Sequence, residues 1–539
     1  MSCEARLKIA CWTGGTEQES SIIGERVLPM EMLERVFMLL PPRDLKAVKQ
    51  VCKRWKEAAS APKLWTWVVF AFRLNSEDDD MFSQKMISLP WLQAVREIKF
   101  ISGFFWNKEF LTHVLCKALN HPGLKKLVIR EGDFSTVEPE LLANFLTKME
   151  EVNLSDVLLS TEQKRAFLSA FQKTSNKIKI LSWEDDKCLE MYREYSQLPN
   201  ITKKLEKLTL NLNFELSTVQ SLFKALKEED TALRSLCLKI DYFRNIDPVT
   251  LSQVVAKLEE VTLDQSFVCA NLTVEQYNEI SNAVSTDGSK LRKLVLKGEG
   301  SLINMKPETL ARLTVCLEEL DIEGADLERN QTRGMLAAIL ENPGKLKTLN
   351  ISRNNLALVD LYLLSGITRL LVNLDLGSTN LRKGSIPTLM AAIAENPGKL
   401  KNLILQGNDL SSDPERVIAK MVTKVESLNI AKTELSRDQT EKIFEAIADS
   451  PGVLKNLNID SNDLSKVNPE VLAVAVNRLE TIYLSDMPLI TQLQMKLILR
   501  EGLEKGTALK KLAISPERRS LSVFQEPQNR KLYNKLFCA

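Results

Sequence analysis

The chain has 539 residues, with 72 basic and 70 acidic side chains. This length exceeds what one ordinary hydrophobic core organises, so it predicts several domains or a repeating solenoid. The near-cancellation of charge argues against nucleic-acid and membrane-surface partners, because both require a dominant basic patch.

The cysteines and the N-terminus predict a protein of the cytosol, the nucleus or both. The nine cysteines are scattered and odd in number, which favours reduced thiols over a disulfide framework. The start, MSCEARLKIACW, mixes charged residues into its apolar ones and lacks the apolar stretch of a secretory signal. The apolar runs along the chain are too short to span a bilayer.

Residues 1–24 are polar and are predicted to be a flexible lead-in. A segment rich in large apolar residues follows at 25–66. Its first helix is predicted to begin near Pro29 and to end before Pro41. The apolar residues at helical spacing there are Leu33, Val36, Phe37 and Leu40. A second helix is predicted from an N-cap at Asp44, and it carries Val48, Val51, Cys52 and Trp55.

The segment at 25–66 resembles an F-box. The matching positions are Leu28-Pro29, Glu31, Leu33, Val36-Phe37, Leu40-Pro41, Asp44-Leu45, Val51-Cys52-Lys53-Arg54-Trp55 and Leu64-Trp65. The pattern departs at Val36, where isoleucine is commoner. The resemblance implies docking on the Skp adaptor and, through it, on the cullin and RING subunits of a ubiquitin ligase. The implied adaptor-binding residues are Leu28, Pro29, Leu33, Val36, Phe37, Leu40, Leu45, Val51 and Trp55.

The size of this segment independently predicts a covering partner. About forty residues cannot bury a stable core of their own, and the segment has no metal-ligand set or plausible disulfide. Each Leu, Val or Phe that a partner covers contributes roughly 1.5–3 kcal/mol. The alternative is that these residues only pack the segment onto the repeats that follow.

Residues 67–94 are predicted to be a transition segment. The stretch LWTWVVF at 64–70 imitates the strand pattern of the later repeats. We therefore expect a strand here that holds the F-box-like segment rigidly against the repeats. The acidic run EDDD at 77–80 is interpreted as a solvated loop.

Residues 95–516 repeat a short apolar pattern. Between Leu346 and Leu464 it reads L-x-x-L-x-L with a polar ninth residue, in steps of 25, 29, 25 and 29 residues. This is the leucine-rich-repeat signature, in which each unit is one strand and one returning helix that only stacking can bury. The predicted first positions are Val95, Leu124, Met149, Ile178, Leu205, Leu233, Leu258, Leu291, Leu317, Leu346, Leu371, Leu400, Val425, Leu454, Leu479 and Leu509.

Two classes of repeat alternate, with Asn or Thr at the ninth position. These residues are Asn354, Asn408, Asn462, Thr379 and Thr433. We expect their side chains to bind the backbone of the turn that follows each strand. The alternation resembles the ribonuclease-inhibitor type of leucine-rich repeat, which implies an α/β horseshoe solenoid with parallel strands inside and helices outside. Residues 517–539 are predicted to cap its open end.

Alternation along each strand predicts which residues face the inner side of the solenoid. Up to Leu317 these positions carry opposite charges on neighbouring rungs, as at Lys126 and Glu151, and we expect such rungs to pair. From Leu346 onward they are mostly amides, which suit binding of a peptide or loop. The candidate cargo-binding residues are Asn350, Asn373, Asn402, Gln406, Asn429, Asn456 and Tyr483. The alternative is a merely hydrated sheet face.

No constellation in the sequence predicts catalysis. The chain has two histidines and no spaced cysteine clusters, which argues against a zinc site. No Gly-rich phosphate loop follows a strand, and no nucleophile is placed with a base and an orienting group. We therefore expect a non-catalytic protein that needs no metal or cofactor.

Together these features predict the substrate-recognition subunit of a ubiquitin ligase. The F-box would bind the Skp adaptor and the repeats would bind an unidentified target protein, which is thereby ubiquitinated and degraded. A second hypothesis is a stand-alone protein-binding or inhibitory scaffold of the ribonuclease-inhibitor type. A third is a small-ligand sensor, although the near-neutral inner face lacks the basic pocket that an inositol phosphate would need.

Overall fold

The computed structural model describes the chain in segments, which form two compact units, Met1–Ile240 and Asp241–Ala539. The predicted acidic loop at 77–80 and the predicted cap at 517–539 lie outside the described residues. The described residues are 30–37, 48–61, 64, 67–71, 95–103, 108–120, 123–171, 176–184, 198–199, 202, 204–212, 215–228, 231–239, 243–264, 272–298, 302, 305–343, 345–381, 384–395, 399–450, 453–484, 491–504 and 507–514.

The F-box-like segment contains two short helices, α2 (Met30–Phe37) and α4 (Lys53–Ala59). The ring of Phe37 meets the ring of Trp55 edge-on, with centroids 5.2 Å apart, so the two helices are joined through aromatic packing. The prediction of one continuous helix through Val48 and Trp55 is wrong. Cys52 has extended backbone angles and is the N-cap of α4, so the chain turns before it and brings Trp55 back toward Phe37.

The predicted transition strand is present as β1 (Trp67–Ala71). It pairs in parallel with β2 (Glu97–Gly103), from Trp67 opposite Glu97 to Ala71 opposite Ile101. Strand β1 is therefore an additional strand of the sheet before the first full repeat. The sequence LWTWVVF, which is similar to the strand pattern of the repeats, predicted this strand.

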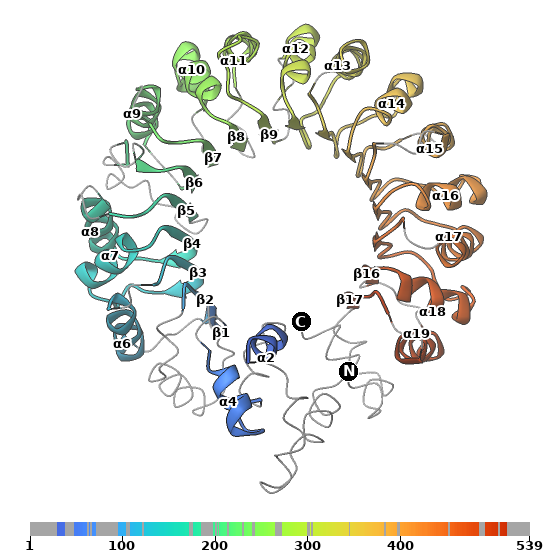
Figure 1. The fold of residues 1–539 in the computed structure, drawn as a ribbon. Helices are drawn as coiled ribbons and strands as arrows, with labels where there is room; N and C mark the ends of the chain where they lie inside the picture. The colour runs from blue at the N-terminus through green and yellow to red at the C-terminus, as the bar shows by residue number, and fades with distance from the viewer. Residues whose placement is uncertain are drawn as a thin grey trace, which may run out of the picture. The chain divides into compact units, whose positions relative to one another are not determined.

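The first unit continues with alternating strands and helices, and its strands β1 to β7 pair in parallel in chain order. Strands lie on the inner side of the stack and helices on its outer side (Figure 1). The remaining elements are α6 (Lys108–Leu119), β3 (Lys126–Asp133), α7 (Pro139–Thr147), β4 (Glu151–Leu158), α8 (Thr161–Phe171), β5 (Ile180–Glu184), β6 (Lys207–Asn211), α9 (Leu216–Lys227) and β7 (Ser235–Lys239).

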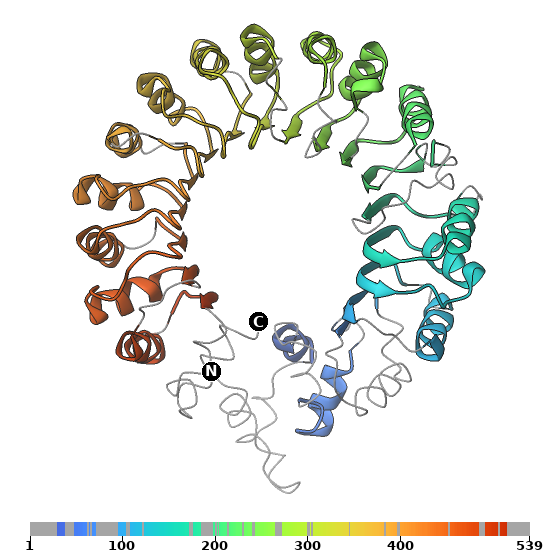
Figure 2. The same cartoon turned by 180° about the vertical axis from the view of Figure 1, so that it is seen from behind.

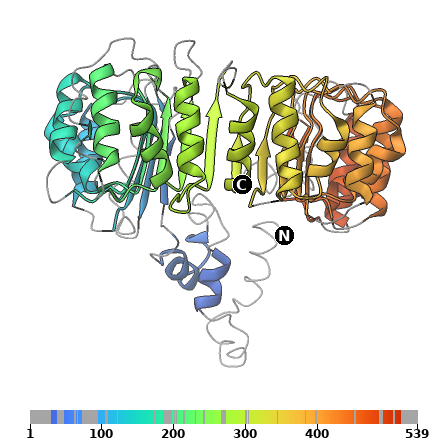
Figure 3. The same ribbon diagram turned by 90° about the horizontal axis from the view of Figure 1, so that it is seen from above.

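The second unit has the same arrangement, with β8 to β17 paired in parallel in chain order (Figure 2). Its helices stand side by side on the outer face (Figure 3). Its elements are η4 (Phe243–Asn245), α10 (Pro248–Lys257), β8 (Glu260–Asp264), α11 (Val274–Val284), β9 (Lys293–Lys297), α12 (Pro307–Cys316), β10 (Glu319–Asp321), α13 (Arg329–Glu341), β11 (Thr348–Asn350), α14 (Leu361–Ile367), β12 (Asn373–Asp375), α15 (Ser385–Glu395), β13 (Asn402–Ile404), α16 (Glu415–Val422), β14 (Ser427–Asn429), α17 (Arg437–Asp449), β15 (Asn456–Asn458), α18 (Pro469–Arg478), β16 (Thr481–Leu484), α19 (Gln492–Glu504) and β17 (Lys511–Ile514).

Every predicted repeat position is confirmed, including Ile178, where the sequence NKIKILSWEDD follows the pattern least closely. In each of the sixteen repeats the strand begins two residues after the predicted first apolar residue. The fourth residue of the pattern, such as Leu349 or Leu403, has no more than 3% of its surface exposed. The leucine spacing therefore places each strand because it selects which side chains enter the core between sheet and helices.

The polar ninth residues form the predicted ladder along the turns of the second unit. Asn408 is buried, and its Nδ2 donates to the carbonyls of Leu405 at 3.0 Å and of Leu376 in the preceding repeat at 2.7 Å. Its Oδ1 accepts from the backbone N–H groups of Thr379 and Leu381. Asn354 and Asn462 make equivalent bonds. This confirms the expectation that the amides satisfy backbone groups left unpaired by the departing chain.

A second buried ladder, formed by glutamines in the first turns of outer helices, was not predicted. Gln439 donates from Nε2 to the carbonyls of Leu410 at 2.8 Å and Asp413 at 2.6 Å, both in the preceding repeat. The other members are Gln163, Gln276, Gln331 and Gln494. Their regular sequence spacing carried the signal, because all but Gln163 are separated by 55 residues or by twice 54.

Candidate partner-binding surfaces

Helix α2 of the F-box-like segment has both buried and exposed apolar side chains. Leu33 and Phe37 are 5% and 1% exposed, so they form the interior of the segment beside Trp55. Met32 is 45% exposed on another side of the same helix. The sequence-derived site did not include Met32. The signal for it is that this apolar residue lies off the stripe of Leu33, Val36, Phe37 and Leu40, which gives α2 a second apolar side.

The remaining predicted adaptor contacts fall into two groups. Val51 and Trp55 are half-buried at the turn before α4 and in its first turn. Nothing is described for Leu28, Pro29, Leu40 and Leu45, which lie outside the described residues, or for the side chain of Val36. The adaptor-binding set as a whole therefore stays a prediction.

The seven predicted cargo-binding residues lie on the inner face of the second unit, and we call them the amide surface. They are Asn350, Asn373, Asn402, Gln406, Asn429, Asn456 and Tyr483. In the strand register, Asn373 on β12 lies between Asn402 on β13 and Thr348 on β11. Asn350 lies two residues after Thr348 on β11. The amides form a hydrogen-bonded row, because Asn402 donates to Asn373 and Asn373 donates to Thr348 at 2.8 Å.

The other members of the amide surface bond in smaller groups. Asn429 donates to Gln406 at 3.0 Å and accepts from the backbone of Ala431. The hydroxyl of Tyr483 accepts from Lys511 at 2.9 Å, and the same ammonium lies 4.8 Å from the centre of the Tyr483 ring. Asn456 is half-buried and aligned with Ser427 and Thr481 in register.

A groove of about 240 Å³ crosses the five strands β9 to β13 on this face. It contains three of the predicted residues, Asn350, Asn373 and Asn402. Gln406 and Asn429, with Asn456 and Tyr483, are not part of its lining. The full lining is Lys293, Glu319, Leu320, Asp321, Thr348, Leu349, Asn350, Asn373, Leu374, Asp375, Asn402 and Ile404. The groove thus extends from the charged strands β9 and β10 to the amide-bearing strands β11 to β13.

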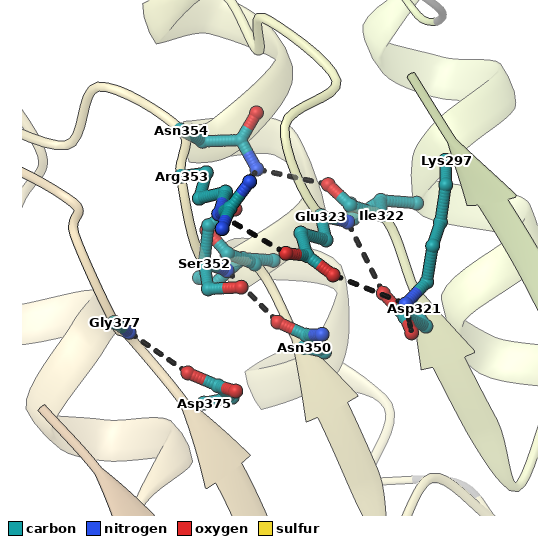
Figure 4. Close-up of polar contacts among 11 residues, drawn as sticks. Lys297, Asp321, Ile322, Glu323, Asn350, Ser352, Arg353, Asn354, Asp375 and Gly377 are labelled. Carbon is teal, nitrogen blue, oxygen red and sulfur yellow. Dashed lines mark hydrogen bonds and ion pairs between the residues drawn. The ribbon is translucent and has the colours of Figure 1, made fainter. Parts of the chain in front are cut away.

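A cluster of charges stands at the edge of this groove (Figure 4). Lys297 pairs with Asp321 at 3.2 Å and with Glu323 at 3.0 Å. Arg353 pairs with Glu323 at 3.2 Å from the neighbouring repeat. Burial alone would lower the pKa of Lys297, but the hydrogen bonds and charges of both carboxylates outweigh it and raise that pKa. The two carboxylates therefore favour the protonated form of Lys297.

Asp375 is the carboxylate next to this cluster, on β12. Its Oδ1 accepts from the backbone N–H of Gly377 at 2.8 Å, and no ion pair to it is found among the residues described. Burial raises the pKa of Asp375, and the negative charges of Glu323 and Asp321 raise it further, against the opposing hydrogen bond from Gly377 and the positive charge of Lys297. The groove therefore holds a carboxylate that would be stabilised by an additional positive charge.

The predicted pairing of oppositely charged rungs is confirmed where the structure describes it. Lys126 meets Glu151 at 2.7 Å, and Lys293 meets Glu319 at 2.9 Å. These pairs are partly exposed to solvent and contribute less than about 1 kcal/mol each. The charges of neighbouring strands therefore neutralise each other, and the carboxylate of Glu319 in the groove is already paired with Lys293.

Metal-binding and membrane-spanning features were searched in the described part of the chain. Over those residues, no three His, Cys, Asp or Glu side chains are placed to hold a metal ion. In the same part, none of the helices is both long and apolar enough to pass through a bilayer.

Comparison with known families identifies the N-terminal segment. Residues 26–71 match the F-box-like family model. The chain carries an F-box-like segment followed by leucine-rich repeats. The match ends at Ala71, which is also the last residue of β1.

Two further comparisons concern the whole chain. The search of curated proteins returned no match. Among solved structures, the leucine-rich repeat-containing protein LegL7 from Legionella pneumophila is similar, at 16% identity and a TM-score of 0.36. The match covers 61% of this chain and 96% of LegL7.

Proposed function

We propose that this F-box-like leucine-rich-repeat protein is the substrate-recognition subunit of a Skp–cullin–F-box type ubiquitin ligase. The observation that carries the proposal is the F-box-like match at 26–71, continued through β1 into the repeats. F-box segments generally dock on Skp-type adaptors. The repeats then supply a broad inner face for a target protein.

The mechanism is proximity. The adaptor, cullin and RING subunits supply the ubiquitin-transfer chemistry, and this chain raises the local concentration of the target beside them. The five-residue pairing of β1 with β2 supports this role, because it replaces a flexible tether by backbone hydrogen bonds. We place this activity in the cytosol or nucleus.

The exposed side of α2 provides the test of adaptor docking. We expect Met32→Asp to weaken binding of a purified Skp-type adaptor at least about tenfold, because it puts a charge into a surface that must be desolvated. Met32→Leu retains the apolar surface and should bind within about threefold of the natural chain. Binding is measured by calorimetry with the full-length chain.

Stability measurements make this test decisive. Met32 is half-exposed, so Met32→Asp should leave the thermal midpoint nearly unchanged. Phe37→Ala should instead lower it, because the ring packs against Trp55 in the interior. Unchanged adaptor affinity in a folded Met32→Asp variant would contradict docking through this side of α2.

A further inference from the structure

The groove across β9 to β13 has the dimensions of a polypeptide site. Adjacent strands lie about 4.8 Å apart, so five strands span roughly 19 Å, the length of about six extended residues. Its volume of about 240 Å³ is below the range usual for drug-sized ligands and accommodates one long side chain with neighbouring backbone. A partner segment running across the strands is therefore favoured over a small molecule.

The charges of the groove select a cationic side chain. Its lining holds three carboxylates and one ammonium group. Glu319 is matched by Lys293, and Asp321 by Lys297, whereas Asp375 has no ion pair among the described residues. An acidic segment would be repelled here, and a Lys or Arg side chain would complete the set.

The inward-facing positions of β11 to β16 carry no cation that would compete with a partner's cation for Asp375. From β11 to β16, the positions that face the inner side include no Lys or Arg and two carboxylates, Asp375 and Asp460. A cation entering from a partner therefore meets no basic side chain at these inward positions. The cations nearby, Lys297 and Arg353, are already paired with Asp321 and Glu323. The same rungs supply the amides of Asn350, Asn373 and Asn402, which can bond both the N–H and the C=O groups of an extended backbone.

We infer that the groove binds an extended segment of the target protein that presents a Lys or Arg side chain, with its cation against Asp375 and its backbone against the amides of Asn350, Asn373 and Asn402. This inference rests on the proposed function, and it specifies the chemical class of target. Arg fits better than Lys, because its planar guanidinium can bond both oxygens of one carboxylate at once.

The experiment uses the full-length chain immobilised on a surface and four degenerate heptapeptide pools. The central residue is fixed as Arg, Lys, norleucine or Glu, and the flanking positions are mixed. We expect the Arg pool to be retained at least about fivefold more than the norleucine and Glu pools, with Lys intermediate. Equal retention of the Arg and norleucine pools would overturn the inference.

A matched pair of variants assigns the preference to this groove. Asp375→Asn keeps an oxygen to accept from Gly377 and should abolish most of the Arg preference. Asp460→Asn removes a carboxylate from the same face outside the groove lining and should leave the preference intact. Loss of the preference in both variants, or in neither, would contradict a cation site at Asp375.

Adaptor binding separates this inference from the proposed function. Asp375→Asn should bind the Skp-type adaptor as the natural chain does, because Asp375 is not in the F-box-like segment. If the adaptor binds and no pool is preferred, the cation site is refuted and the ligase role stands. If Arg pools are preferred in an Asp375-dependent way and the adaptor does not bind, the cation site stands and the ligase role is refuted.

Discussion

Replacing Asp413 by valine should stabilise the chain at pH 7.5 by roughly 2 kcal/mol. Asp413 is 5% exposed, and among the described residues its Oδ1 has no hydrogen-bond partner. Burial raises its pKa to about 6, with a further contribution from the charge of Asp409. A shift of this size corresponds to about 3 kcal/mol, which we reduce because solvent near half-exposed Asp409 screens part of the field.

Sister repeats show which side chain this position accepts. The carbonyl of Asp413 receives the bond from Gln439, and the residues whose carbonyls receive the equivalent bond are Val137, Ile246, Met305 and Val467. These four are apolar and at most 3% exposed. Valine at position 413 therefore reproduces a side chain that the fold already buries there.

The pH dependence identifies the cause. The folded-state pKa of Asp413 lies above the ordinary value of 3.8, so the folded chain binds more protons and its stability falls as pH rises from about 4 to about 6. The stability difference between Asp413→Val and the natural chain should therefore be full above pH 6 and shrink toward pH 4. Urea melts of both proteins across this range measure it.

Asp409→Asn provides the control for this prediction. It removes the charge that helps to raise the pKa of Asp413, so the transition should move to lower pH without disappearing. Because only the difference between two proteins is compared, titration of other carboxylates cancels. A stability difference that is constant from pH 4 to pH 7.5 would contradict a buried, ionising Asp413.

Replacing Asn408 by alanine should destabilise the second unit by about 3 kcal/mol. The side chain is 2% exposed and bridges two repeats. Its loss leaves the backbone N–H groups of Thr379 and Leu381 without the oxygen they now share. Native-state hydrogen exchange of the amides in β12 and β13 measures the local cost.

The exposed Asn355 is the matched control. It makes one local bond, from the backbone of Ala357 to its Oδ1 at 3.1 Å. Asn355→Ala should cost under about 1 kcal/mol. Equal effects of the two substitutions would show that the buried amide ladder does not hold neighbouring repeats together.

The repeat architecture was predictable because one physical requirement recurs along the chain. Each strand must send its fourth and sixth residues into the core, so the leucine spacing locates the strand even in the weak repeat at Ile178. The ninth-position amides were predictable for the same reason, since every turn leaves similar backbone groups unpaired.

Features that depend on one location were not predictable in the same way. The break at Cys52 and the division between Met32 and Phe37 follow from how α2 meets α4, which helical spacing alone does not specify. The groove at Asp375 depends on which side chains its neighbouring strands present. Asp413 is recognised only after the glutamine ladder aligns the repeats, because a lone aspartate in a turn has no unusual pattern.

Adaptor binding by the purified, full-length chain tests the central claim most directly. Titration calorimetry with a Skp-type adaptor should give one adaptor per chain and a dissociation constant below about 1 μM, since several buried apolar anchors outweigh the entropic cost of docking. A folded, monomeric chain that gives no binding at about 10 μM adaptor would contradict the ligase role and leave the leucine-rich-repeat fold unaffected.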